Sequence, residues 1–147
     1  MTGFLEGLTD RGATPALVKT LAFNEARLRM VSENIANIQT PGYRAKQLDV
    51  QGFQQSLRDA LELRKKDPNA RFAVENKREV TTRPDGTLKV TPSLVPPENI
   101  LFHDGTNASL ERQMAELAEL GMVHDATTQL LQKRFEGLQK AIRGTVG

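Results

Sequence analysis

The sequence contains no cysteine and no tryptophan, and it has one tyrosine among its 147 residues. Without cysteine the chain cannot form a disulfide, bind zinc through thiolates or use a cysteine nucleophile. Hydrophobic residues make up 38% of the chain and aromatic residues 5%, whereas soluble domains reach roughly 45–50% when glycine is also counted. The length suits one domain, or one and a half, and the composition indicates that its apolar residues fill a compact core poorly.

The chain also lacks an excess of one charge and any long apolar run. Its 20 basic and 18 acidic residues leave a net charge of +2, which favours neither nucleic acid nor an anionic membrane. No apolar stretch approaches the ~20 residues of a membrane-spanning helix. Residues 1–17 have neither the basic start nor the apolar run of a cleaved signal peptide. We therefore expect no nucleic-acid partner, no direct membrane insertion and no cleaved signal.

A heptad pattern runs through the first third of the sequence. Residues separated by alternating steps of four and three form what we call the first seam: Leu17, Leu21, Asn24, Leu28, Val31, Ile35 and Ile38. This is the spacing of a coiled-coil contact line. Thr14 and Pro15 suit a helix start, and Pro41 with Gly42 suits a stop. The pattern predicts a helix over residues 14–38.

A second heptad pattern runs to the end of the chain. It defines the second seam: Leu110, Met114, Leu117, Gly121, His124, Thr128, Leu131, Phe135, Leu138 and Ile142. Asn107 or Ser109 suits the helix start and Gly144 its end. Residues 108–125 carry a net charge of −3 and residues 126–147 of +3, which complements the helix dipole. We expect one helix of about 34 residues, a length typical of coiled coils or helical assemblies.

The middle of the chain predicts small, irregular elements. Val50, Phe53, Leu57 and Leu61 are spaced for a short amphipathic helix, and residues 64–69 suggest a loop after it. Residues 80–83 and 88–91 flank Pro84-Asp85-Gly86, which favours a hairpin with a type I turn and a glycine bulge. Residues 92–97 suggest an extended connector. Because an isolated hairpin is marginally stable, this region needs support from the rest of the molecule.

Few residues suggest a catalytic or metal-binding site. The two histidines, His103 and His124, each precede an aspartate, but no further ligands or nucleophile–base pairs accompany them. The basic run Arg64-Lys65-Lys66 is interpreted as a solvated face. We expect no catalytic residue, no metal and no cofactor, and therefore no enzyme.

Three asparagines have a special place on the first predicted helix. Asn24, inside the first seam, is either a tolerated polar residue near an exposed edge or an amide that fixes the helix register. Asn34 and Asn37 are three residues apart and share one flank. The following Thr40-Pro41-Gly42-Tyr43 suits a type II turn, because proline presets φ and glycine adopts positive φ. The segment is either an amide-rich helix end or a fixed corner that offers amides to a neighbouring subunit.

The stretch Asn34-Ile35-Ala36-Asn37-x-x-Thr40-Pro41-Gly42-Tyr43 resembles the signature of the bacterial flagellar axial proteins, the family of rod, hook and hook-junction subunits. Residues 44–50, residues 104–107 and residues 134–142 are similar to stretches of the proximal rod members. Ala108-Ser109 and the poor centre of the second seam depart from the family pattern. The resemblance spans about residues 15–143.

The resemblance implies a mainly α-helical fold. Residues 1–40 and 108–147 would form a discontinuous inner coiled-coil domain, and residues 41–107 a connecting middle with a short helix and a β-hairpin. It implies a structural subunit of the periplasmic rod of the flagellar basal body, stacked helically into a hollow drive shaft that transmits torque and passes exported subunits.

The implied partners are copies of the chain itself, the adaptor at the MS ring, distal rod subunits and the flagellar type III export apparatus. A small coiled-coil adaptor, export chaperone or regulator that acts as a soluble dimer is the alternative. If neighbours complete the rod subunit's core, we expect residues 1–40 and 108–147 to be largely disordered in the dilute monomer.

Overall fold

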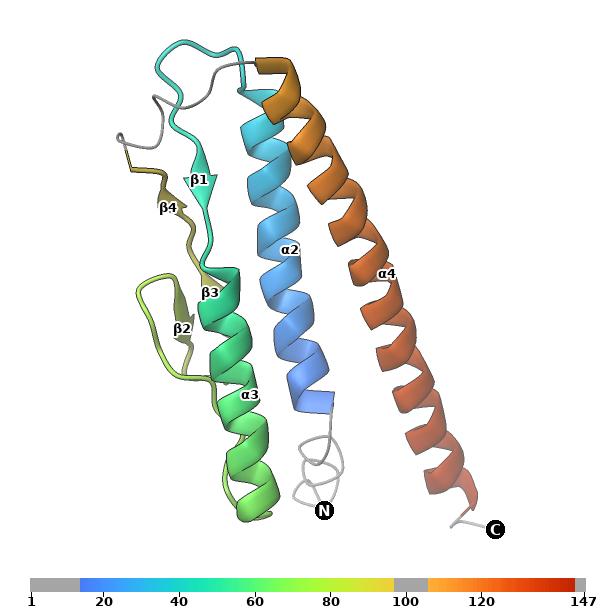
Figure 1. Cartoon of the computed structure of the whole chain (residues 1–147). Helices are drawn as coiled ribbons and strands as arrows, with labels where there is room; N and C mark the ends of the chain where they lie inside the picture. The colour runs from blue at the N-terminus through green and yellow to red at the C-terminus, as the bar shows by residue number, and fades with distance from the viewer. Residues whose placement is uncertain (1–13, 97–105, 145–147) are drawn as a thin grey trace.

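The computed structural model describes residues 14–96 and 106–144, with side chains from residue 110 onward in the second range. Two long helices dominate it: α2 (Thr14–Ala36) and α4 (Thr106–Gly144). They lie side by side and antiparallel, and they separate towards the start of α2 (Figure 1). The predicted fold class, mainly helical with long N- and C-terminal helices packed together, is confirmed.

The helix ends differ from the expected ones by a few residues. Helix α2 begins at Thr14 as expected, but it ends at Ala36, and residues 37–42 form turns. Helix α4 begins at Thr106, just before the expected caps, and reaches Gly144. At 1.5 Å per residue α2 is about 34 Å long and α4 about 58 Å. One end of α4 therefore extends beyond the helix that it packs against.

The third helix, α3 (Val50–Lys66), lies on the other side of α2 from α4 (Figure 1). Asp49 caps its start, because its carboxylate accepts a hydrogen bond from the backbone N–H of Gly52 at 2.9 Å. Residues 64–66 belong to this helix, so the prediction that a loop begins at residue 64 is wrong. The N–H of Asp67 still donates to the carbonyl of Leu63 at 2.9 Å, which continues the helical pattern through the basic run.

Two small antiparallel strand pairs complete the described fold. Strands β2 (Val80–Thr82) and β3 (Leu88–Val90) form the predicted hairpin, with Val80 opposite Val90. Its turn has Gly86 at φ +86°, and the Gly86 N–H donates to the Arg83 carbonyl at 2.9 Å. The predicted type I turn with a glycine bulge is therefore confirmed.

The second strand pair was not expected. Strand β1 (Lys46–Gln47) pairs with β4 (Ser93–Leu94), with Lys46 opposite Leu94. The segment interpreted only as an extended connector thus holds a strand, which ties the start of the middle region to its end.

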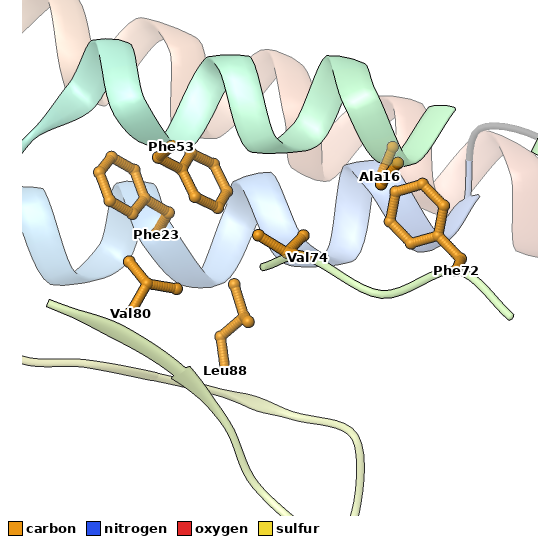
Figure 2. Packing of buried hydrophobic residues seen from close by; sticks show 8 residues of the cluster. Ala16, Phe23, Phe53, Phe72, Val74, Val80 and Leu88 are labelled. Atoms are coloured by element: carbon orange, nitrogen blue, oxygen red, sulfur yellow. The ribbon is translucent and has the colours of Figure 1, made fainter. Parts of the chain in front are cut away.

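The main core lies between α2 and the middle region. The rings of Phe23 on α2 and Phe53 on α3 stack with centroids 4.0 Å apart and an interplanar angle of 4°. Side chains from the β2–β3 hairpin and from the irregular segment before it pack against the two rings (Figure 2). The buried residues of this core are Ala16, Phe23, Phe53, Ala60, Phe72, Val74, Val80 and Leu88.

This core gives the middle region the support that the sequence indicates it needs, because α2 supplies Ala16 and Phe23 to it. Apolar residues are few, but the chain concentrates them on one face of α2 and the elements that cover it. A smaller cluster of Met30, Val31 and Leu120 joins α2 to α4. One chain therefore buries one face of α2 by itself, and the disorder expected for residues 1–40 and 108–147 of the dilute monomer stays a prediction.

Candidate assembly surface

The corner after α2 is organised by Asn34, which is 8% exposed. Its Oδ1 accepts hydrogen bonds from the Tyr43 hydroxyl and from the Lys46 backbone N–H, both at 2.9 Å. Its Nδ2 donates to the Lys46 carbonyl, also at 2.9 Å. One side chain thus joins the last turn of α2 to the returning strand β1. The expectation of a fixed corner fits this geometry, but the interpretation that Asn34 offers its amide to a neighbouring subunit is wrong.

The turn itself has the predicted type II form. The Tyr43 N–H donates to the Thr40 carbonyl at 3.2 Å, and Gly42 has φ +77°. No heavy atom lies within 4 Å of a Cβ built on Gly42, so the backbone conformation, rather than lack of space, requires glycine there. Pro41 is exposed at the tip of the turn.

Asn37 lies towards solvent, in contrast to Asn34. Its Nδ2 donates to the Glu33 carbonyl at 2.9 Å, and its Oδ1 accepts from the Thr40 hydroxyl at 3.2 Å. Both hydrogen bonds are local and exposed. Of the two amides that the sequence places on one flank, one holds the corner and the other covers the end of the helix.

An ion pair borders the corner. Lys46 Nζ lies 2.7 Å from Glu33 Oε1, and this hydrogen bond raises the pKa of Lys46. Burial raises the pKa of Tyr43, Glu33 raises it further, and Lys46 opposes both effects. Only the protonated phenol can donate to Asn34, and the raised pKa extends the pH range of that hydrogen bond upward.

Residues of the first seam, on α2, take part in the contact with α4. Val31 and the buried Met30 contact Leu120 of α4, with Ile35 and Leu117 beside them. Asn24 is buried within the same helix. It lines a small cavity together with Phe53 of α3 and Leu120 of α4, so it is not near an exposed edge, and its role as a register-setting amide stays a prediction. The remaining seam residues are all half-buried: Leu17, Leu21, Leu28 and Ile38.

The second seam is only partly covered. Leu131 is buried, but Met114 is 56% exposed, Phe135 45% and Ile142 40%. The face of α4 that packs on α2 also uses Leu120 and Thr127, which the predicted seam omits; both are buried. The other seam residues are half-buried: Leu110, Leu117, Gly121, His124, Thr128 and Leu138. Met114 and Phe135 therefore present large apolar side chains to a partner outside the chain.

Polar contacts fix how α2 and α4 pair. Arg27 Nη2 lies 2.7 Å from Glu116 Oε1 in a partly buried ion pair. His124 Nε2 lies 3.7 Å from Glu25 Oε1, and its Nδ1 lies 3.6 Å from Asp125 Oδ1. The C-terminal end of α4 projects past the start of α2 (Figure 1).

Metal-binding side chains are scattered over the described part of the chain. Within residues 14–96 and 106–144, no group of three metal-binding side chains lies together, and His103 is outside the described residues. No helix in the described part of the chain is long and apolar enough to cross a membrane.

A second apolar stripe on α2 was missed in the sequence. Ala16, Phe23, Ala26 and Met30 are all buried, and they recur at steps of seven, three and four. This spacing is itself helical. Counting both stripes would have shown that α2 is covered on two sides.

Comparison of the chain with family models, with curated proteins and with solved structures found no significant match.

Proposed function

We propose that the chain is a structural subunit of the proximal rod of the bacterial flagellar basal body, of the FlgB type. Many copies, with other rod proteins, stack helically into a hollow shaft in the periplasmic space. The shaft transmits torque and lets later subunits pass. The chain performs no catalysis and carries no cofactor.

The observation that carries this proposal is the signature segment and the corner that it forms. Residues 34–43 resemble the axial-protein signature. Three of these residues have structural roles in the corner, which gives a physical reason for their presence in the signature. Asn34 holds the returning strand, Gly42 supplies positive φ, and Tyr43 donates to Asn34. In an assembly this corner sets the angle at which the long helices leave the middle region.

The uncovered apolar side chains give independent support. Met114, Phe135 and Ile142 belong to the heptad pattern, yet each is at least 40% exposed. Large apolar side chains grouped on one helix favour contact with another chain. In the rod, neighbouring copies would cover such side chains, and the adaptor at the MS ring and the distal rod subunits would contact the ends of the stack.

Export through the flagellar type III apparatus agrees with the sequence. A chain without cysteine forms no disulfide that would block passage of an unfolded polypeptide.

One observation favours the alternative of a soluble coiled-coil adaptor, chaperone or regulator. The core between α2, α3 and the hairpin lies within one chain, so a folded, discrete dimer is physically reasonable. In that case the exposed side chains of α4 pair with one partner only.

A gene deletion separates the two functions. If the chain is a rod subunit, cells without it assemble no rod beyond the inner-membrane ring, and the chain is found in purified basal bodies at a fixed number of copies. Basal bodies that contain a complete rod but lack the chain would contradict the proposal. Purified chain that remains a dimer at every concentration would favour the adaptor.

A further inference from the structure

An open groove with a volume of about 1230 Å³ follows the first half of α2. The tip of the β2–β3 hairpin and residues 69–72 form its opposite side, and Phe135 of α4 also lines it. Two large apolar side chains, Val18 at 48% and Phe135 at 45%, remain exposed there. The groove is therefore an incompletely covered surface of the molecule.

The groove is strongly basic. Six basic residues line it against Glu25 and Asp85: Lys19, Arg29, Arg64, Arg71, Arg83 and Lys89. Arg29, Arg71 and Lys89 are exposed, and among the described residues none of these three forms an ion pair. A concave surface with uncompensated charge of one sign concentrates an oppositely charged partner. The occupant is therefore expected to combine acidic and apolar side chains.

The outer face of α4 has this combination. Glu111, Ala115, Ala118, Met122 and Asp125 recur at helical steps of four and three, and all five are exposed. Met122 is 69% exposed, the highest value among the large hydrophobic residues of the described structure. Residues 108–125 contain four acids and one base. The alanines let another backbone approach closely, and Glu119 adds charge at the border of the face.

The two surfaces cannot meet within one chain. Met122 follows Leu120 by two residues, which turns it by about 200° around the helix axis. Leu120 is buried against α2, so Met122 lies on the far side of α4 from α2, and the groove lies along α2. A second copy of the chain carries a partner surface of the required chemistry.

We propose that the acidic outer face of α4 in one copy docks in the basic groove of the next copy. This inference rests on the proposed function and names the contact through which copies stack. The joined surfaces differ, so each added copy leaves one groove and one helix face open. Such a heterologous contact grows without closing, as a helical assembly requires. An amphipathic helix seated in a groove is a common mode of protein recognition.

Charge reversal tests the contact. The groove variant combines Arg29→Glu, Arg71→Glu and Lys89→Glu, and the helix variant combines Glu111→Lys, Glu119→Lys and Asp125→Lys. Sedimentation velocity over a range of concentrations measures association of the full chain. Each variant alone presents two surfaces of the same sign. We expect each to raise the midpoint concentration for association at least about tenfold, equivalent to about 1.4 kcal/mol.

Restoration of association by combining the two variants is the decisive test. A chain with all six substitutions again has opposite charges on its two surfaces, so its midpoint should return to within about threefold of wild type, or roughly 0.7 kcal/mol. The matched control combines Arg58→Glu, Lys65→Glu and Lys66→Glu on exposed positions of α3 outside the groove. It changes the net charge as the groove variant does and should associate like wild type.

Two results overturn the contact while leaving the proposed function intact. One is wild-type association that the groove variant does not change, and the other is a six-site variant that stays dissociated. A wild-type chain that stays monomeric at every concentration contradicts both the contact and stacking of copies.

Cross-linking gives a second readout. Because the chain has no cysteine, a short bismaleimide joins only introduced thiols. A mixture of the Val18→Cys and Met122→Cys variants should form cross-linked dimers that neither variant forms alone. Dimers in a sample of one variant alone would mean that like surfaces meet, which contradicts the heterologous contact.

Discussion

Replacing Asn34 with alanine tests the corner that joins α2 to the rest of the chain. The substitution removes three hydrogen bonds, to the Tyr43 hydroxyl and to the N–H and carbonyl of Lys46, each 2.9 Å long. A hydrogen bond contributes about 0.5–1.5 kcal/mol net, and a partner left unsatisfied costs more. We therefore expect Asn34→Ala to lower the free energy of unfolding by about 3 kcal/mol.

Asn37→Ala is the matched control, because it removes the same side chain three residues later. Asn37 makes only local, exposed hydrogen bonds, with Glu33 and Thr40, so its replacement should cost less than about 1 kcal/mol. Urea unfolding followed by circular dichroism at equal chain concentration measures both values. Equal losses for the two variants would refute the role assigned to Asn34.

Three further predictions concern the core, the turns and the single tyrosine. Phe23→Ala should lower the free energy of unfolding by about 3–5 kcal/mol, because Phe23 is 1% exposed. Phe135→Ala should change the free energy of unfolding of the monomer by less than about 1 kcal/mol. Similar losses for the two variants in urea unfolding would contradict the assigned core. Gly42→Val should reduce motility in a complementation assay more than Gly86→Ala, because both turns have positive φ but only the first sets the direction of a long helix; equal motility would count against this. Absorbance at 295 nm reports Tyr43 alone, since the chain has one tyrosine and no tryptophan, and it should titrate above its usual pKa of about 10. A pKa raised in the folded state contributes stability below the unfolded pKa, and this contribution is lost as the pH rises through the folded pKa; a midpoint at or below about 10 would contradict the burial of the phenol.

Local features of the fold were predictable from short stretches of sequence. Thr14-Pro15 marks the start of α2, and Pro84-Asp85-Gly86 specifies the hairpin turn, because proline fixes its own φ and glycine readily adopts positive φ. The same holds for Pro41-Gly42. In each case the conformation depends on one or two residues and little on the rest of the chain.

Features that depend on distant residues were predicted less well. Strand β4 consists of two residues, and it exists because β1 lies beside it, which no local pattern reveals. The heptad pattern indicates that α4 is amphipathic, but it does not fix which flank meets α2. The buried Leu120 and Thr127 move the contact face away from Met114 and Phe135.

The candidate site shows the same limit. The sequence places Asn34 and Asn37 on one flank of the helix, but it cannot tell that the chain returns past Asn34 alone. That difference comes from the direction of the type II turn, which carries Tyr43 and Lys46 back to Asn34. The role of an amide at a helix end is thus decided by the path of the chain after the helix.

A subunit-resolution map of flagellar basal bodies purified from cells that produce this chain tests the proposed rod function. If the proposal is right, repeated copies occupy the proximal rod, with α2 and α4 paired and the outer face of α4 against the groove of a neighbour. A complete rod in which no density fits this chain would contradict the proposal.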